Sequence, residues 1–441
     1  MPHKIKKTIL LFGDIFVLYF SLYSTLLIRY QENISNEWDG HVWFFSTIFI
    51  LWIIIFYISN LYNLNITINT QNFTLRALRA VGISALMSIL YFYLNANVSI
   101  SPKTNLAIFT IIFSIIFILW RRLYNLLLSS YLPKNNIGFL GYNEQVKELI
   151  KIIKERPQLG FAVSFVIKKE EIDNIDIKKI IQESHISTVI LASNIDSSPN
   201  LRHQLFSSLT LKINIINLPK FYEHITGKIP IEAISQMWFL ENLSEGSKKW
   251  FDTVKRIYDI MFSSTIIAVS FPFWFIIALI IKKGSLGPVF FVQERTGKNN
   301  KNFSVIKFRT MTVNNNNYSP TIGNDKRITR FGNFLRKTRL DELPQLINIL
   351  LGDMSLVGPR PERPEYIAEL KKEIPFYEER MLVKPGLTGS DQISGEYHSP
   401  SKEDTLKKLQ YDLYYIKNRS IYLDLSIILK TIATVFSKGG M

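Results

Sequence analysis

The sequence contains no cysteine among its 441 residues. Disulfide bonds, cysteine-based zinc sites and a thiol nucleophile are therefore excluded. The six histidines never occur in the HExxH spacing, so a zinc protease has no support. The sequence also contains only a poor match to a glycine-rich phosphate-binding loop. The segment around Gly138 and Gly141 lacks the third glycine and the close spacing of a dinucleotide-binding fingerprint.

Acidic residues are outnumbered, with 36 Asp and Glu against 52 Lys and Arg, which gives a formal net charge of +16. A strongly basic chain can bind nucleic acid, but here the basic residues flank long apolar segments, and 47% of all residues are hydrophobic. This arrangement is typical of a membrane protein whose positive flanks lie against anionic lipid. We therefore expect membrane lipid as a partner and no nucleic acid.

Four N-terminal segments, residues 8–28, 42–64, 75–94 and 106–128, are apolar. Each approaches the roughly 20 residues that a helix needs to cross a bilayer. The first lacks the small-residue cleavage site of a signal peptide, and further spans follow it. Asp14 within it would be costly in lipid, so we expect this side chain to face the other helices in a packing or capping role.

Basic residues concentrate on one side of these four spans. The poor side has only Arg29 and Lys103. The rich side carries Lys4, Lys6, Lys7, Arg76, Arg79, Arg121, Arg122 and Lys134. The positive-inside rule then predicts that the N-terminus and everything after the fourth span lie in the cytoplasm.

Residues 135–227 alternate short apolar strands with amphipathic helices, which predicts a Rossmann-like α/β domain with a parallel sheet. The expected strands are 136–140, 161–167, 188–192 and 213–217, and the expected helices are 144–156, 175–184 and 201–209. Because the glycine fingerprint is poor, we interpret this domain as one without a cofactor. Residues 228–250 are interpreted as a connector.

The apolar run 257–281 is long enough to span a membrane, yet basic residues flank it at both ends. Both ends are therefore predicted to lie in the cytoplasm. Pro272, in the middle of the run, disrupts a helix because its ring clashes with the preceding turn. A kinked, re-entrant hairpin over residues 255–283 satisfies both observations. The alternative is a fifth crossing helix with a proline kink, which would place Asp341 outside.

The stretch 336–365 organises the rest of the chain. A helix that begins near Leu340 would carry Asp341 and Glu342 in its first turn, where the helix dipole favours acids. Three basic residues precede the pair: Arg336, Lys337 and Arg339.

This pattern is suited to phosphate chemistry. A carboxylate beside arginines stays ionised at neutral pH, and arginines also bind phosphate oxygens. An ionised aspartate in such a place can attack phosphorus and hold an aspartyl-phosphate, while a second acid binds Mg²⁺ or moves a proton. The alternative interpretation is that the Asp-Glu pair merely starts a helix among solvating arginines.

The sequence around Asp341 and Glu342 resembles the bacterial sugar transferase family, the large monotopic phosphoglycosyl transferases. The shared motifs are GPVFF at 287–291, QER at 293–295, KFRTM at 307–311, LDELPQL at 340–346, GDMSLVGPRP at 352–361 and VKPGLTG at 383–389. The resemblance implies a membrane protein with four transmembrane helices in 1–134, a Rossmann-like middle domain and a mainly α (α+β) catalytic domain, 251–441. It also implies a re-entrant helix broken at Ser270 and Pro272.

The resemblance further implies the transfer of a sugar-1-phosphate from a UDP-sugar to undecaprenyl phosphate, at the cytoplasmic face of the bacterial inner membrane. Asp341 matches the family's nucleophile, which carries the phosphosugar covalently, and Glu342 matches its partner acid. Both acids would hold Mg²⁺. Arg336 matches a phosphate-binding arginine. Weaker matches for substrate contact are Lys307, Arg309, Arg360 and Arg380.

Two other classes are less well supported. A transporter or polymerase should place ionisable residues deep in several spans, and few occur beyond Asp14. A non-catalytic membrane scaffold of the same fold would not require the intact acid pair and its arginines.

One loop departs from the family, which often reads Trp-Ala-Gln-Val-Asn-Gly-Arg after the last motif. Here Ser390 replaces the tryptophan and Glu396 replaces the arginine, which indicates altered donor contacts. The sugar itself is not specified: the resemblance favours glucose or galactose, and acetamido sugars stay open. The same resemblance implies a regulatory or assembly role for the middle domain. A homodimer formed through this domain is the corresponding hypothesis.

Overall fold

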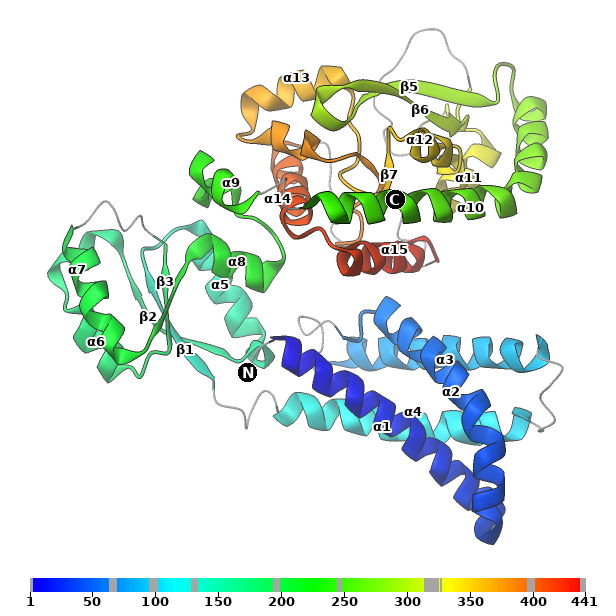
Figure 1. Cartoon of the computed structure of the whole chain (residues 1–441), viewed down its shortest axis with the longest axis horizontal. Helices are drawn as coiled ribbons and strands as arrows, with labels where there is room; N and C mark the ends of the chain where they lie inside the picture. The colour runs from blue at the N-terminus through cyan, green and yellow to red at the C-terminus, as the bar shows by residue number, and fades with distance from the viewer. Residues whose placement is uncertain are drawn as a thin grey trace. The chain divides into compact units, whose positions relative to one another are not determined.

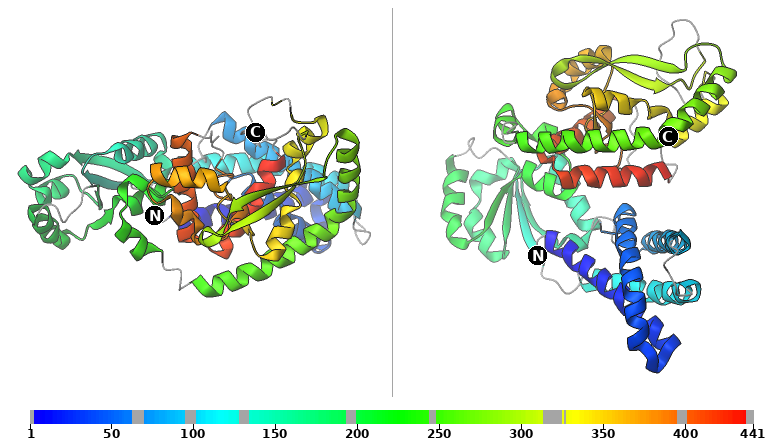
Figure 2. Two further views of the ribbon diagram at one scale, coloured as in Figure 1. Left: turned by 90° about the horizontal axis from the view of Figure 1, so that it is seen from above. Right: turned by 45° about the vertical axis from the view of Figure 1, so that its right-hand side comes forward.

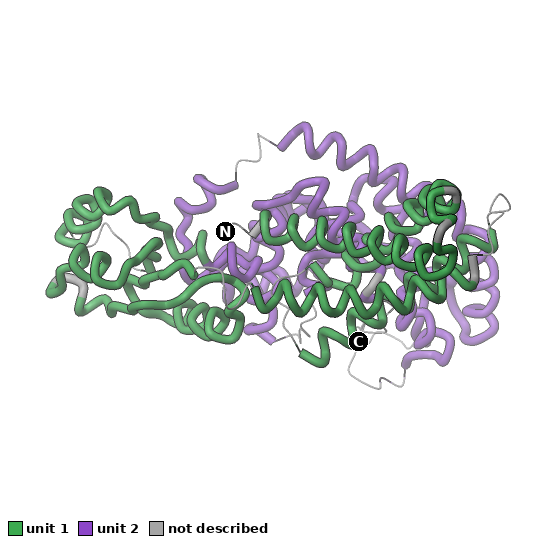
Figure 3. Tube along the Cα trace, turned by 90° about the horizontal axis from the view of Figure 1, so that it is seen from below, with its two compact units in different colours: residues 1–221 green, residues 222–441 purple. Residues whose placement is uncertain are grey.

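The computed structural model describes residues 3–62, 70–94, 102–127, 134–192, 199–243, 248–312, 325, 327–394 and 401–436. The chain folds into two compact units, residues 1–221 and 222–441 (Figure 3). The first unit contains the apolar N-terminal helices and the α/β domain, and the second contains the acid pair. The finer boundaries at 134, 227 and 250 stay predictions.

Four long helices open the first unit: α1 (His3–Tyr30), α2 (Ile34–Ile58), α3 (Gln71–Leu94) and α4 (Pro102–Leu126) (Figure 1). They confirm the four predicted apolar helices, although the predicted ends at Leu64 and Leu128 lie outside the described residues. Aromatic rings fill much of the core between them, and Trp52 packs edge-on against Phe109 and Phe113. Each helix is long and apolar enough to cross a membrane, so the chain is a membrane protein with several candidate spans.

Asp14 in α1 is fully buried. Its carboxylate accepts hydrogen bonds from Arg121 Nη2 at 2.5 Å and from Trp120 Nε1 at 3.1 Å, both on α4. Arg121 also donates to the carbonyl oxygen of Leu61, just beyond α2. These contacts confirm that Asp14 faces the other helices, where it joins α1 to α4.

The rest of the first unit is built on a parallel four-stranded sheet in the order β2-β1-β3-β4. Its strands are β1 (Asn135–Leu140), β2 (Phe161–Ile167), β3 (Thr188–Leu191) and β4 (Asn214–Asn217). The helices are α5 (Glu144–Glu155), α6 (Ile177–Glu183), α7 (Pro199–Ser208) and, across the boundary between the units, α8 (Leu218–Thr226). The predicted Rossmann-like architecture is confirmed.

The two glycines of the imperfect fingerprint have local structural causes. A Cβ atom at Gly138 would lie 2.2 Å from the ring of Phe165 on the neighbouring strand. Gly141 has a φ of 101°, a backbone conformation that residues other than glycine rarely adopt. Packing and turn geometry therefore explain both positions.

The second unit contains a helix of 36 residues, α10 (Lys249–Gly284), preceded by the short α9 (Gln236–Asn242). Figures 1 and 2 show α10 changing direction partway along. Pro272 lies inside the helix, where it has no N–H to donate to the preceding turn. Ser270 Oγ accepts a hydrogen bond from Trp274 Nε1 at 3.0 Å. The helix is continuous through Ser270 and Pro272, so these two residues do not break it as predicted.

Much of the apolar surface of α10 is unpacked. Phe271, Phe273 and Phe275 are each at least 60% exposed. The helix is also one of five described helices long and apolar enough to cross a membrane. A continuous apolar surface of this kind is suited to lipid.

The remaining elements of the second unit are mainly helical, as predicted. The strands β5 (Phe290–Thr296) and β6 (Asn302–Phe308) form an antiparallel hairpin, and β7 (Ser355–Val357) and β8 (Gly386–Thr388) pair in parallel. The helices are α11 (Arg330–Thr338), α12 (Gln345–Leu351), α13 (Pro364–Glu373), α14 (Lys402–Asn418) and α15 (Ile421–Phe436). Because β7 and β8 are parallel, the loops that follow them leave the same edge.

Candidate active site

The acid pair lies in a turn between two helices. Helix α11 ends where Arg339 adopts a left-handed conformation with φ of 56°, and Leu340–Glu342 form a 3₁₀ turn. Helix α12 begins only at Gln345, with Pro344 as its N-cap. The prediction of a helix from Leu340 was therefore wrong, because the left-handed residue and the turn after it separate the acids from α12.

Asp341 is only 9% exposed, and its Oδ1 atom makes no hydrogen bond to any residue that the structure describes. Burial raises the pKa of Asp341 to about 6, and the charge of Glu342 adds to the rise, against the opposing charges of Lys307 and Arg336. The carboxylate is thus mostly ionised at neutral pH and keeps one oxygen unengaged. Such a group can act as a nucleophile.

Glu342 is surrounded by cations. Its Oε1 atom accepts hydrogen bonds from Arg360 Nη2 at 2.8 Å and Lys307 Nζ at 3.0 Å, and lies 3.9 Å from Arg339 Nη1. Burial alone would raise the pKa of Glu342, but these three positive charges lower it well below its usual range. Glu342 therefore stays ionised and positions the surrounding basic side chains.

Arg336 lies beside the pair. Its Nε atom donates to Thr310 Oγ1 at 2.9 Å, and its charge acts on Asp341. The fold thus brings together five of the residues identified from the sequence, from three separate segments of the chain: Asp341, Glu342, Arg336, Lys307 and Arg360.

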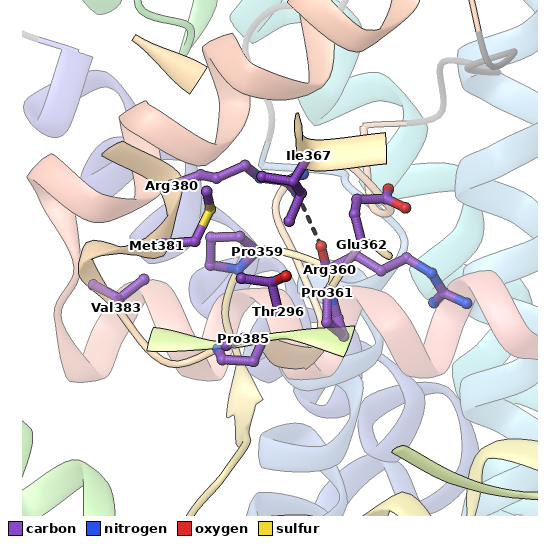
Figure 4. Close-up of a pocket in the computed structure, with 11 residues that line it drawn as sticks. Thr296, Pro359, Arg360, Pro361, Glu362, Ile367, Arg380, Met381, Val383 and Pro385 are labelled. Carbon is purple, nitrogen blue, oxygen red and sulfur yellow. Dashed lines mark hydrogen bonds between the residues drawn. The ribbon is translucent and has the colours of Figure 1, made fainter. Parts of the chain in front are cut away.

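Two other predicted substrate-binding arginines have structural partners instead. Arg309 donates to the carbonyl oxygens of Ser285 at 2.8 Å and Leu286 at 2.9 Å, and so fastens the chain just after α10. The buried Arg380 forms an ion pair with Asp412 at 2.9 Å and donates to the carbonyl oxygen of Arg360 at 3.0 Å (Figure 4). Arg309 is not brought to the acid pair, and Arg380 supports the loop that carries Arg360.

Asp412 was not predicted from the sequence to be part of this arrangement. It lies on the face of α14 that also buries Leu409 and Leu413. The sequence did contain a signal for Asp412, namely a charged residue on the apolar face of an amphipathic helix. Such a residue indicates a buried ion pair, because a buried charge needs a partner.

A small cleft of about 10 Å³ lies beside the loop 358–362. Figure 4 shows that prolines and aliphatic side chains form much of its wall, and that the guanidinium of Arg360 points away from Met381 and Val383. Neither acid lines the cleft, and ligand pockets usually measure roughly 300–1,000 Å³. The cleft is therefore too small for a nucleotide sugar.

Fold and site together define a class of protein: a membrane protein that sets a carboxylate with an unengaged oxygen among basic side chains suited to phosphate. The family model for bacterial sugar transferases matches residues 250–438. A UDP-glucose:undecaprenyl-phosphate glucose-1-phosphate transferase of Klebsiella pneumoniae is 31% identical over 312 residues, which cover 68% of this chain and 67% of that protein. The chain belongs to the bacterial sugar transferase family.

Two further relatives align over shorter lengths. A UDP-N-acetylgalactosamine-undecaprenyl-phosphate N-acetylgalactosaminephosphotransferase of Aeromonas hydrophila is 37% identical over 52% of this chain and 53% of its own length. A UDP-glucose:undecaprenyl-phosphate glucose-1-phosphate transferase of Escherichia coli K12 is 42% identical over 41% of this chain and 39% of its own length. The chain thus spans about half the length of several curated relatives that it matches.

Proposed function

We propose that this protein transfers a sugar-1-phosphate from a UDP-sugar to undecaprenyl phosphate, as the first membrane step of surface polysaccharide synthesis. The observation that carries the proposal is the difference between the two acids. Glu342 holds the cations, whereas Asp341 keeps an unengaged oxygen. The names of the relatives, which specify UDP-sugars and undecaprenyl phosphate, support the choice of substrates.

In the first step, an oxygen of Asp341 attacks the phosphorus atom next to the sugar. The bond from that phosphorus to the bridging oxygen breaks, and UMP leaves with the bridging oxygen. In the second step, a phosphate oxygen of undecaprenyl phosphate attacks the same phosphorus and displaces the Asp341 carboxylate. Arg336 and the cations around Glu342 offset the negative charge of the phosphates in both steps.

The acid pair also fits Mg²⁺. Asp341 Oδ1 has no hydrogen-bond partner among the described residues. Those residues contain no group of three or more acidic, histidine or cysteine side chains that could enclose an ion alone. Mg²⁺ commonly binds to one or two carboxylates plus substrate phosphates, so we assign Asp341 and Glu342 to hold it together with the diphosphate. When bound, the ion would neutralise charge on the diphosphate.

The path of α10 is proposed to be re-entrant, with both ends at the cytoplasmic face of the inner membrane. The change of direction along α10, the proline inside the helix and the basic residues at both of its ends support this path. It would hold Asp341 at the interface, where a lipid phosphate and a water-soluble UDP-sugar can both reach it.

The donor is proposed to be a hexose, with glucose or galactose favoured over an acetamido sugar. The relatives include transferases for both glucose and N-acetylgalactosamine, so the choice needs a direct measurement.

The test uses the purified full-length protein with Mg²⁺ and a panel of UDP-sugars, first without lipid. We expect UMP release and a phosphosugar mass adduct from one donor, both absent in Asp341→Asn. UMP released only after undecaprenyl phosphate is added would contradict a stable covalent intermediate. No UMP under either condition would contradict transferase activity and favour the scaffold alternative.

A further inference from the structure

Asp391 is a buried acid to which the proposed reaction gives no role. It is 7% exposed, and its Oδ1 atom makes no hydrogen bond to any described residue. The same holds for the hydroxyl oxygen of the adjacent Ser390. Buried polar atoms without partners are costly, so two of them side by side point to a ligand.

The fold places Asp391 against the loop that carries Arg360. Loops 358–362 and 389–394 leave the same edge of the parallel pair β7 and β8, and Gly358 N donates to the carbonyl oxygen of Thr388 at 2.9 Å. A Cβ atom at Gly389 would lie 2.7 Å from Gly358 O and 2.9 Å from Asp391 Oδ1. The Asp391 carboxylate is therefore fixed where the two loops touch.

Arg360 connects this position to the acid pair. It donates to Glu342 at 2.8 Å, and its pKa is raised chiefly by the charge of Glu342, with smaller contributions from Glu362 and Asp391. Arg380, the other nearby arginine, is already bonded to Tyr377, to Asp412 and to the carbonyl oxygen of Arg360. Within the described residues, Asp391 lies in the field of both arginines without forming an ion pair with either.

We propose that Asp391, with Ser390 beside it, accepts hydrogen bonds from hydroxyl groups of the nucleotide-sugar donor and thereby selects the donor. This inference rests on the proposed function. A carboxylate accepts strong hydrogen bonds from hydroxyl groups, and a site built for a hydroxyl strongly rejects an analogue that lacks it. A uronic acid would be repelled by the like charge. The substrate class is therefore a neutral hydroxylated hexose, although the ribose supplies the same chemistry.

The experiment compares wild type with Asp391→Asn on the best natural donor and on analogues that each lack one hydroxyl group. We expect Asp391→Asn to lower kcat/KM for the natural donor about 10- to 100-fold. The analogue that lacks the bonded hydroxyl should lose a similar factor with the wild type and little more with the variant. Deoxy-hexose donors and a 2′-deoxyuridine donor separate hexose from ribose contacts.

Glu403→Gln, an exposed change at the start of α14, serves as the matched control and should match wild type on every donor. If Asp391→Asn fails to fold, Ser390→Ala is used in the same comparison. An equal loss on every donor, analogues included, would overturn the inference in favour of a structural role. A wild-type protein that releases no UMP from any donor would instead overturn the proposed function itself.

Discussion

Asp341 and Glu342 are neighbours of nearly the same chemistry, yet the fold gives them opposite environments. The sequence predicted that basic residues keep Asp341 ionised. In the structure the closest cations bind Glu342 instead, while burial raises the pKa of Asp341 to about 6. The identities of both acids were predictable from the motif. The different environments of the two acids were not predictable, because they depend on the direction in which each side chain leaves a single 3₁₀ turn.

Asp341→Asn should abolish transfer and raise the thermal stability of the protein. Because burial disfavours the charged carboxylate, a neutral amide removes a cost on the order of 1–3 kcal/mol. UMP release and the melting temperature in detergent measure the two effects. Glu342→Gln is the matched comparison and should lower stability, since it leaves the cations around it without their counter-charge. A melting temperature of Asp341→Asn below that of wild type would contradict this account.

The pH dependence follows from the same carboxylate. Asp341 must be ionised to attack, so UMP release without lipid should fall as the pH drops through about 6. The folded pKa is raised above the unfolded value of 3.8, so the folded state binds this proton more tightly. Its contribution to stability therefore grows as the pH falls from about 6 towards 4, and should be absent in Asp341→Asn. A midpoint for activity near 4 would argue against Asp341 as the nucleophile.

At the scale of elements, the absence of cysteine makes the path of α10 directly measurable. Single cysteines at the exposed positions Lys249 and Lys283 can be labelled with a membrane-impermeant maleimide. A re-entrant helix exposes both only in inside-out vesicles, because both ends face the cytoplasm. A cysteine at Asp39, on the predicted outer side, should show the reverse pattern. Labelling of Lys249 and Lys283 positions from opposite sides would establish a crossing helix.

Local patterns predicted most of the elements. Each of the four N-terminal helices is a long apolar segment, each strand of the parallel sheet is a short apolar run, and the structure confirms them. The strands β7 and β8 were not predicted. Each has only three residues, too few to show a pattern, and their pairing joins segments about 30 residues apart. The edge that brings Asp391 near Arg360 was therefore invisible in the sequence.

At the scale of the whole first unit, Lys6 joins the membrane helices to the α/β domain. It is 3% exposed, and its ammonium donates to the carbonyl oxygens of Gln158 at 3.1 Å and Leu159 at 2.9 Å. Tyr124 on α4 donates to the carbonyl oxygen of Lys6 at 2.7 Å. From the sequence, Lys6 was expected only to help orient the chain, whereas in the structure it also connects α1 to the α/β domain.

Lys6→Met should loosen this contact and destabilise the first unit by about 1–3 kcal/mol, because it leaves two carbonyl oxygens without their donor. Limited proteolysis of the α/β domain in membranes would report the change as faster cleavage. Lys7→Met is the control, since it removes the same charge from an exposed neighbour. Equal cleavage of the two variants would assign the effect to charge alone.

The common edge of β7 and β8 has a practical meaning for engineering. The acid pair comes from the turn between α11 and α12, whereas Ser390 and Asp391 come from the loop after β8. A library confined to residues 390–394 would therefore vary the proposed donor contacts and leave the acid pair unaltered. Directed evolution of such a library offers a route to glycolipids that carry unnatural first sugars.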